Sequence, residues 1–421
     1  MTIALDLPLH RFDRIPVLLL GGVNLVRALG RAGIPAVVAS CDAHEPAFAS
    51  RYCLGKCVLP PLDHGEAAVD AIVRIGDRLS SLHGRRVPLM YGSDDYLKLI
   101  YAHRDRLQRY FLLLLNEPEI AEAMLAKDQF QSLAERCGLP VPSSLSWEGK
   151  GPGTVAGHAG PVLVKPSNKA DWADAPLRRQ LFHDAKALVF DNGAAAAADA
   201  VVALYRDQLT FQQYIPGDDT CIGSFHGFAD EKGRVLDSFV GRKLRTFPPL
   251  TGESSFIELD HDEELAALGR DIAARLPIKG VFKMDFKKEP RTGRWYLLEI
   301  NARFNLWHYL GAYNGVNLLR VAYDYVLEGT RPQSPQAYAT GYRWLSLELD
   351  ARAFLDLHSR NALGTASWIL SILLSRNIYN VFSWSDPVPL AKLWVHRFGR
   401  GWSRGPEKFL SLVRLWRSTA S

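Results

Sequence analysis

The residues with the clearest capacity for chemistry lie in the stretch 281–303, VFKMDFKKEPRTGRWYLLEINAR. Two runs of strand-favouring residues flank a polar break at 288–293, and this pattern predicts a β-hairpin. If the hairpin closes within this break, Asp285 lies opposite Glu299, and their Cβ atoms are about 4.5–5.5 Å apart. Because side chains alternate along a strand, Glu299 and Asn301 share a face. Two carboxylates and one amide oxygen therefore converge on one patch.

This convergence is typical of a cation site. Like charges so close together repel each other, and a bound divalent cation relieves the repulsion. Mg²⁺ prefers hard oxygen ligands and is usually held by one or two carboxylates together with substrate phosphates. The alternative interpretation is an exposed hairpin whose polar face is solvated, and both interpretations fit the hairpin residues taken alone.

Cations follow two other predicted strands. Lys165 lies at the end of the apolar stretch 161–167, where packing does not require a charge. The strand within 235–249 runs into Arg242, Lys243 and Arg245, three cations in four residues that are suited to hold an anion. The alternatives are a lysine whose amine reaches water from a strand edge and a basic edge that protects a strand from pairing.

Composition excludes several classes of protein. The chain has 421 residues, 48% hydrophobic and 23% charged, as is ordinary for a globular protein of two or three domains. A net charge of +5 gives no reason to expect nucleic acid as a partner. Five cysteines, an odd number, make a disulfide framework improbable and fit a reducing, cytoplasmic environment. We expect neither a signal peptide nor a membrane span.

The elements upstream must position these side chains. Residues 16–40 read as strand, glycine turn, helix and strand, which predicts a βαβ unit and a parallel sheet. The turn at Gly21-Gly22 lacks the full glycine pattern of a dinucleotide-binding loop. Another strand at 87–92 ends in Ser93, Asp94 and Asp95. These residues either face a ligand crevice at the carboxyl end of the sheet or cap the following helix.

From about residue 335 the chain becomes rich in tryptophan. Its last part, 388–421, carries seven Lys or Arg residues and one acid, Glu407. Basic residues interleaved with Trp, Phe and Leu are typical of a helix that contacts a membrane surface or a partner. The alternative is a C-terminal helix packed on the body with a basic outer face.

Taken in order, these segments resemble the ATP-grasp superfamily of ATP-dependent carboxylate ligases. The resemblance covers about residues 15–330, and its most specific part is Asp285 with LLEINAR at 297–303, similar to the family's LLEINPR signature, with Ala302 in place of proline. It implies an α/β protein in which an N-terminal parallel-sheet domain precedes an ATP-grasp fold, whose two α+β subdomains clamp ATP, and a helical extension follows. The expected boundaries are 1–115 for the first domain, 116–334 for the ATP-grasp domain with its lid at about 127–210, and 335–421 for the extension.

The resemblance also implies roles for individual residues. Two lysines would reach the ATP phosphates, one strand would bind adenine through its backbone, and an aspartate would lie near the ribose; these residues are Lys127, Lys165, Gln212, Gln213, Tyr214, Ile215, Asp218 and Asp219. The metal, Mg²⁺ or alternatively Mn²⁺, would be bound by Asp285, Glu299 and Asn301. An arginine would lie near the transferred phosphoryl group, and two cations would hold the acyl substrate or its phosphate: Arg303, Lys243 and Arg245. The family's glycine-rich phosphate loop is poorly represented, because 168–184 contains no glycine, so closure of this loop must rely on other residues.

The resemblance implies that a carboxylate attacks the γ-phosphate of ATP, forms an acylphosphate and is then joined to an amine. We therefore expect an ATP-dependent carboxylate–amine ligase that acts on a small molecule such as an amino acid, a peptide or a precursor of the cell envelope or of a secondary metabolite. Biotin carboxylase-like chemistry is a third possibility within the superfamily. The alternative of a different class is a catalytically silent ATP-binding scaffold that engages a membrane or partner through 388–421. The sequence gives no indication of the oligomeric state.

Overall fold

The computed structural model describes residues 5–6, 12–149, 151, 153–167, 175–182, 187–250 and 252–401. Its N-terminal part is a sheet of the order β1-β4-β3-β2-β5-β6. All pairs are parallel except that of β1 with β4, so the expected parallel sheet is confirmed. The strands are β1 (Leu5–Asp6), β2 (Val17–Leu20), β3 (Ala36–Ser40), β4 (Cys53–Val58), β5 (Val87–Tyr91) and β6 (Phe111–Leu112). The accompanying helices are α1 (Val23–Arg31), α2 (Gly65–His83), α3 (Asp94–Ala102) and α4 (Arg104–Leu107).

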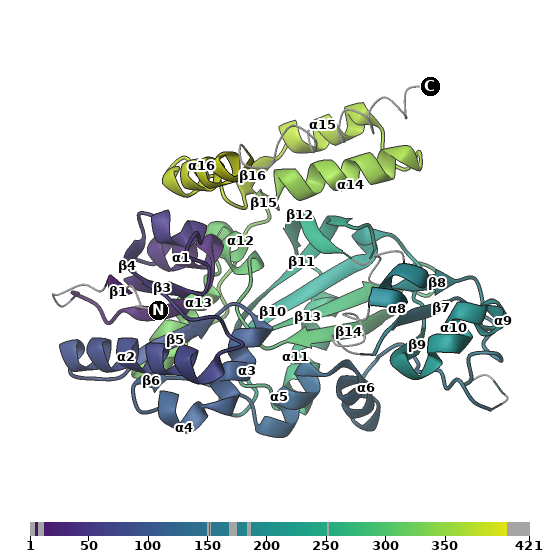
Figure 1. Ribbon diagram of the computed structural model, residues 1–421, viewed down its shortest axis with the longest axis horizontal. Coiled ribbons are helices and arrows are strands. Elements are labelled where there is room, and N and C mark those ends of the chain that lie inside the picture. Colours follow the sequence, from purple (N-terminus) through teal and green to yellow (C-terminus); the bar gives the residue numbers. More distant parts are fainter. Residues whose placement is uncertain are drawn as a thin grey trace.

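A small antiparallel sheet of the order β8-β7-β9 follows two linking helices. It has its own apolar core, which includes Val162, Val164, Phe182 and Phe211. Figure 1 shows this unit at the opposite end of the molecule from the N-terminal sheet. Its strands are β7 (Val162–Pro166), β8 (Leu188–Phe190) and β9 (Leu209–Gln213), and its helices are α8 (Ala175–Gln180), α9 (Gly193–Ala198) and α10 (Ala200–Tyr205). The linking helices are α5 (Pro118–Leu125) and α6 (Lys127–Arg136).

The centre of the molecule is a seven-stranded sheet of the order β14-β13-β10-β11-β12-β15-β16. Phe282, Met284 and Phe286 of β13 enter the core beneath α11 (Glu263–Arg275). Because side chains alternate, the intervening residues of β13 face the other side, toward the N-terminal sheet, α12 (Trp307–Asn314) and α13 (Leu318–Glu328). The strands up to the hairpin are β10 (Ile222–Ala229), β11 (Val235–Phe247), β12 (Glu253–Asp260), β13 (Gly280–Lys288) and β14 (Trp295–Asn301).

The sequence led us to expect a helical C-terminal extension, but the extension also contains strands. Besides α14 (Leu347–Ser359), α15 (Thr365–Leu373) and α16 (Val388–Gly401), it supplies β15 (Tyr342–Leu345) and β16 (Arg376–Tyr379), which widen the central sheet beyond β12. Its helices lie together along one side of the molecule (Figure 1). Residues 402–421, the end of the basic stretch, lie outside the described residues.

Two buried contacts fasten the extension to the N-terminal domain. Asp386 accepts hydrogen bonds from Nε of Arg27 at 2.9 Å and from the Ser50 hydroxyl at 2.7 Å, and both members of the ion pair are 1% exposed. The indole of Trp344 in β15, also buried, donates to Asn24 at 3.1 Å. Among the described segments, none of the helices is both long and apolar enough to traverse a bilayer.

Candidate active site on the central sheet

The hairpin of β13 and β14 has the register expected from the sequence. Asp285 pairs directly with Glu299, and Lys283 pairs with Asn301. Immediately beyond Asp285 the register shifts, because Phe286 pairs with Leu297 and Leu298 is left as an extra residue. Bulges of this kind re-aim side chains and are frequent beside active sites. The local pattern of the sequence therefore placed the two carboxylates correctly.

Asp285 is the buried centre of this patch. Its Oδ2 lies 2.7 Å from Nζ of Lys283 and 3.9 Å from Nζ of Lys243, and the hydroxyl of Ser224, its neighbour on β10, donates to Oδ1. Burial alone would raise the pKa of Asp285, but the two ammonium charges outweigh it and hold this pKa below the ordinary value. Burial lowers the pKa of Lys283, and the charge of Asp285 opposes that effect. The site thus contains an ionised carboxylate between two cations.

A chain of polar contacts continues along β14 into the N-terminal domain. Nδ2 of Asn301 donates to Oε1 of Glu299 at 3.1 Å, and Nη2 of Arg303 donates to Oδ1 of Asn301 at 3.4 Å. Nε of Arg303 also donates to Oδ1 of Asp94 at 2.6 Å. Asp94 is the first residue of α3, at the carboxyl end of β5. Arg303 is therefore held between the hairpin and the N-terminal sheet.

The two interpretations of residues 93–95 apply to different residues. Ser93 caps α3, since its hydroxyl accepts from the backbone N–H of Tyr96 at 3.2 Å. Asp94 faces the candidate site through Arg303. Asp95, in the same turn of α3, is exposed.

The oxygens of Asp285, Glu299 and Asn301 are the groups best suited to hold a metal ion. Across the described ranges, there is no cluster of three or more His, Cys, Asp or Glu residues able to hold one. Two carboxylates and an amide oxygen form an incomplete shell, and such a donor set fits Mg²⁺, which normally completes its coordination with phosphate oxygens and water. Glu299 is exposed on its strand, so its carboxylate is accessible to such a ligand.

The residues expected at the ATP phosphates lie at the edge of the small sheet. Nζ of Lys165 donates to Oε1 of Gln212 at 3.2 Å, and Nε2 of Gln212 donates to Gln131 in α6 at 2.9 Å. Lys127 begins α6, but its side chain lies outside the described residues. In the glycine-free stretch 168–184, residues 168–174 and 183–184 also lie outside them, and 175–180 form α8. Lys165 thus contacts Gln212 in the structure, and the contact of Lys127 with the ATP phosphates stays a prediction.

The segment expected at adenine connects the small sheet to the central one. The backbone N–H groups of Gln213 and Tyr214 donate to the carbonyls of Ser143 and Pro161, each at 2.9 Å, and Ile215 is buried. Gly217 follows with φ +114°, a conformation that L side chains rarely adopt. This glycine allows the chain to turn between the two sheets.

The two aspartates expected near the ribose differ in their surroundings. Asp218 is exposed, and its Oδ1 accepts from the backbone N–H of Thr220 at 2.9 Å. Asp219 is buried and accepts from the N–H and hydroxyl of Thr246 at 2.7 and 2.9 Å and from the N–H of Leu250 at 2.8 Å. Asp219 is buried with hydrogen bonds to both of its carboxylate oxygens, whereas Asp218 is exposed and its bonds to Thr220 engage Oδ1, so Asp218 is the better placed of the two to meet a ligand.

Arg245 does not join Lys243 at the site. The register of β11 against β12 shifts here, so Lys243 pairs with Ile257 and Arg245 with Phe256, adjacent residues whose side chains point to opposite faces. Nε and Nη2 of Arg245 donate to the two oxygens of Asp350 at 2.8 and 2.9 Å. The expectation that Arg245 holds the acyl substrate is therefore wrong, because its guanidinium forms a buried ion pair with Asp350.

Sequence reasoning missed three residues of this constellation: Ser224, Lys283 and Lys287. Lys287, buried on β13, donates from Nζ to the hydroxyl of Tyr214 at 3.2 Å and thus joins the central sheet to the segment expected at adenine. The alternation K-x-D-x-K in 283–287 was an available signal for the two lysines. Ser224 reaches the site by pairing with Asp285 across β10 and β13, and the sequence carried no comparable signal for it.

His226 and His308 lie beside the site as an uncharged pair. Nδ1 of His226 lies 3.4 Å from Nε2 of His308, and Nδ1 of His308 accepts from the backbone N–H of Asn305 at 3.2 Å. Burial, reinforced by the charge of Lys283, lowers the pKa of His308 to about 3. Burial and the neighbouring His308 lower the pKa of His226 as well. Both imidazoles therefore pack as neutral groups at neutral pH.

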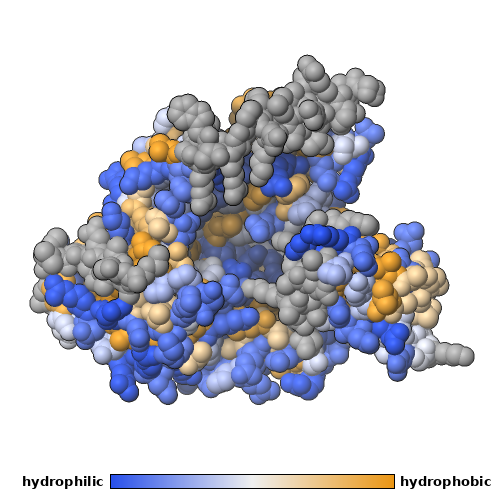
Figure 2. All heavy atoms as spheres, in the orientation of Figure 1, coloured by the Kyte–Doolittle hydropathy of each residue, from blue (hydrophilic) through white to orange (hydrophobic). Residues whose placement is uncertain are grey.

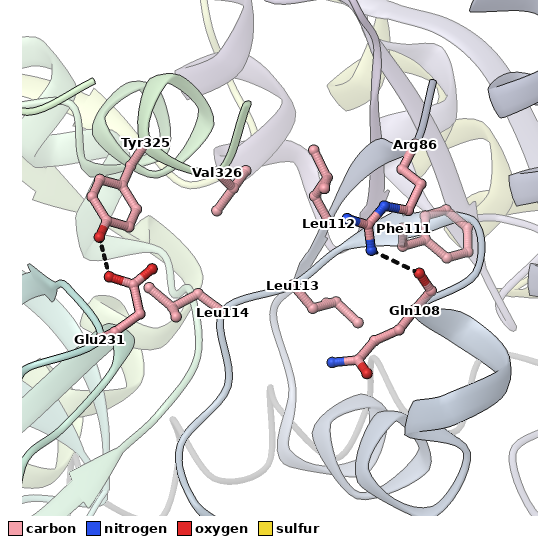
Figure 3. A pocket seen from close by; sticks show the side chains of 9 residues that line it. All are labelled: Arg86, Gln108, Phe111, Leu112, Leu113, Leu114, Glu231, Tyr325 and Val326. Carbon is pink, nitrogen blue, oxygen red and sulfur yellow. Dashed lines mark hydrogen bonds between the residues drawn. The ribbon is translucent and has the colours of Figure 1, made fainter. Parts of the chain in front are cut away.

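Figure 2 shows a hollow near the middle of the molecule, over the central sheet of Figure 1, in which both hydrophilic and hydrophobic residues are visible. A separate cavity of about 170 Å³ lies between β6 and α13. Its polar groups are paired nearby: Tyr325 donates to Glu231, and Arg86 donates to the carbonyl of Gln108 at 3.0 Å (Figure 3). None of the candidate residues lines this cavity, so it is separate from the candidate site.

Known proteins resemble this chain over most of its length. No family model matches it. A curated relative, the D-aspartate ligase of Enterococcus faecium (strain Aus0004), is 24% identical over 321 residues, which cover 73% of this chain and 75% of the relative. The structure of L-amino acid ligase from Bacillus licheniformis matches with a TM-score of 0.52 at 16% identity, over 76% of this chain and 75% of that one. The biotin carboxylase domain of Hydrogenobacter thermophilus 2-oxoglutarate carboxylase, solved with MgADP, matches with a TM-score of 0.52 at 17% identity, over 76% and 71%.

Proposed function

We propose that this chain, a member of the ATP-grasp superfamily, is an ATP-dependent ligase that activates a carboxylate as an acylphosphate and joins it to an amine. The membership and the α/β ATP-grasp fold agree with the expectation from the sequence. The observation that carries the proposal is the cross-strand pair of Asp285 and Glu299, flanked by Lys243, Lys283 and Arg303. This arrangement of oxygen donors and cations suits the transfer of a phosphoryl group more than covalent catalysis.

ATP and Mg²⁺ are the proposed cofactors. A structure that shares the fold was solved with MgADP, and the donor set of Asp285, Glu299 and Asn301 fits Mg²⁺. The ion would offset negative charge on the phosphates during transfer. Lys165 and the segment at 212–215 are the proposed contacts of the nucleotide, with Asp218 rather than Asp219 near its ribose.

The substrate carboxylate would bind on the same face of the sheet. Lys243 and Arg303 are the cations that we propose hold it, and arginine can hold a carboxylate or phosphoryl group in a bidentate manner. The carboxylate oxygen attacks the γ-phosphorus, the bond to the bridging oxygen breaks, and ADP leaves. The amine nitrogen then attacks the acyl carbon and phosphate leaves. Closing the small sheet over the site would exclude water, which otherwise hydrolyses an acylphosphate.

An amino acid is the proposed class of carboxylate substrate. The two ligases that resemble this chain are named for D-aspartate and for L-amino acids. Aspartate carries a second carboxylate, and the cluster of Lys243, Lys283 and Arg303 supplies several cations near one position. We therefore place D-aspartate first and the L-amino acids next.

Trapping with hydroxylamine tests the reaction without knowledge of the natural amine. Purified protein is incubated with ATP, Mg²⁺, hydroxylamine and single amino acids, and hydroxamate and ADP are quantified. The proposal predicts that at least one amino acid gives hydroxamate and ADP in equal amounts. Release of AMP in place of ADP contradicts the acylphosphate route. Tight ATP binding without ADP or hydroxamate for the whole panel instead favours a silent ATP-binding scaffold.

A further inference from the structure

The cavity of about 170 Å³ between β6 and α13 has the size of a small-molecule site. Its walls come from two parts of the molecule. Phe111 and Leu112 form β6 of the N-terminal sheet, whereas Tyr325 and Val326 belong to α13, which packs on the central sheet. For comparison, an apolar cavity of about 150 Å³ can hold a molecule of the size of benzene. The cavity can therefore hold the body of a small organic molecule.

The floor of this cavity is apolar. Leu112, Leu113 and Leu114 line it together with Val326, and all four side chains are partly exposed. A second cavity of about 30 Å³ shares these four residues and continues to Phe304, and its lining contains no charged residue. Covering partly exposed apolar side chains is favourable, so a ligand that fits this floor has an apolar body.

The acidic side of the cavity already has its partners. The hydroxyl of Tyr325 donates to Glu231, and Nη2 of Arg331 donates to the same hydroxyl at 3.3 Å. A cationic ligand at Glu231 would have to compete with this hydrogen bond and would lie close to the guanidinium of Arg331. Glu231 is therefore a poor partner for a ligand.

The basic side of the cavity is different. Arg86 is exposed and donates from Nη1 to the backbone carbonyl of Gln108 at 3.0 Å. Its neighbour Arg85 forms an ion pair with Glu328 at 3.0 Å, but within the described ranges of the chain no acidic side chain pairs with Arg86. The guanidinium is a positive charge beside an apolar floor, and a carboxylate is the anion that fits its planar geometry in a bidentate manner.

The positions of these groups select one kind of ligand. Figure 3 shows the three leucines between Arg86 on one side and Glu231 on the other. A molecule whose carboxylate meets Arg86 would lay its body along the leucines toward Val326. An inorganic anion could meet Arg86 but would leave the leucines in water, and a neutral apolar molecule would leave the charge of Arg86 without a partner.

We propose that this cavity binds a small apolar carboxylic acid, with the carboxylate at Arg86 and the apolar body on the three leucines and Val326. The site shares no residue with the constellation around Asp285 and Glu299, so the proposal does not rest on the ligase reaction. A bound acid would contact both β6 and α13. Because it binds only the folded arrangement of these two elements, it should stabilise the protein against unfolding.

Calorimetric titration of the full chain with 3-phenylpropionate, without ATP, tests the proposal. We expect saturable binding of one molecule per chain and a melting temperature that rises with the concentration of the acid. The alcohol 3-phenylpropan-1-ol has the same apolar body without the carboxylate. It should bind about tenfold more weakly, because it cannot form a charge-assisted pair with Arg86.

Two variants separate the contribution of the charge from that of its position. Arg86→Gln should weaken binding of 3-phenylpropionate about tenfold, because the charged partner of the carboxylate is lost. Arg85→Gln is the matched control, since it removes the neighbouring arginine, which already pairs with Glu328, and it should bind as wild type does. Equal affinity of wild type and Arg86→Gln overturns the proposal, as does the absence of saturable binding to wild type.

A third variant tests the location of the bound acid. Leu113→Trp places a larger side chain in the cavity and should abolish binding, while an unchanged denaturation midpoint shows that the variant is folded. Wild-type affinity in folded Leu113→Trp would place the acid elsewhere on the molecule, for example at Lys243 and Arg303, and would overturn the proposal. The comparison of Arg86→Gln with Arg85→Gln decides the matter if Leu113→Trp does not fold.

Discussion

Arg303 of the hairpin and Asp94 of the N-terminal domain form a direct contact between residues 209 positions apart, with 2.6 Å between Nε and Oδ1. Nη2 of the same guanidinium donates to Oδ1 of Asn301 at 3.4 Å. Asp94 therefore orients a cation of the candidate site from another domain. A residue acting in this way should affect the chemical step more than the binding of nucleotide.

Replacing Asp94→Asn removes the charge that orients Arg303, and we expect kcat to fall about tenfold because small misplacements of a positioning group are costly. The affinity for ATP should stay unchanged. Steady-state kinetics of ADP formation and equilibrium binding of ATP separate the two effects. Asp95→Asn, in the same turn of α3, is the control and should retain wild-type kcat. An equal fall in kcat in both variants would show that the negative charge in the first turn of α3 is responsible, and not the contact of Asp94 with Arg303.

The pair of Arg245 and Asp350 should contribute to stability. Asp350 is fully buried and also accepts from the hydroxyl of Ser255 at 2.9 Å and the indole of Trp368 at 2.8 Å. Removing one partner of a buried ion pair leaves the other charge uncompensated, so Asp350→Asn should lower the free energy of unfolding by about 3–5 kcal/mol. Chemical denaturation measures this change.

Asp356→Asn, on the same helix, is the control for that measurement. Asp356 pairs with Arg360 at 2.8 Å in a partly exposed contact, so its loss should cost less than about 1 kcal/mol. The folded fraction of Asp350→Asn should bind ATP as wild type does. If Asp350→Asn keeps the wild-type free energy of unfolding but no longer binds ligand, Arg245 belongs to the substrate site after all.

The neutral histidine pair should make stability dependent on pH. Below about pH 6.5 the unfolded chain protonates its histidines, whereas His308 in the folded protein stays neutral down to a pKa of about 3. The unfolded state then binds more protons, so the free energy of unfolding falls as pH decreases through this window, by at most about 1.4 kcal/mol per pH unit for each histidine.

Denaturation at pH 7 and pH 5 checks this dependence in wild type and in His308→Gln, which retains an acceptor for the N–H of Asn305. The variant should lose less stability than wild type between the two values. Asp237, whose pKa burial raises to about 6, contributes with the opposite sign, but it is present in both proteins and cancels in the comparison. His64→Gln, at an exposed position, should behave as wild type does. An equal loss of unfolding free energy between pH 7 and pH 5 in wild type and both variants would show that His308 is not the cause of the pH dependence.

The parts of the site that could be predicted are those fixed by local rules. Alternation and a short polar break were enough to pair Asp285 with Glu299, because a hairpin involves neighbouring segments. The position of Arg245 could not be predicted, because it depends on a bulge in β11 that no residue pattern announces. The alternation of side chains predicts which face of the sheet a residue occupies only where the strand has no bulge.

Long-range structure accounts for the remaining differences. Asp94 meets Arg303 only once the two domains have packed, and β15 joins β12 only once the extension has folded back on the sheet. Short strands in a helix-rich segment resemble its loops in sequence. The α/β character of the chain, by contrast, followed from the buried strand runs and glycine turns of its first 115 residues.

The formation of ADP by Glu299→Gln tests the central claim most directly. The substitution keeps the shape of the side chain but removes one carboxylate from the pair with Asp285, and we expect amino-acid-dependent ADP formation to fall about a hundredfold or more. Glu289→Gln, the same change in the turn of the same hairpin, should retain wild-type activity, and both variants should unfold at the same denaturant concentration as wild type. Wild-type rates of ADP formation in Glu299→Gln would contradict the assignment of this hairpin as the phosphoryl-transfer site.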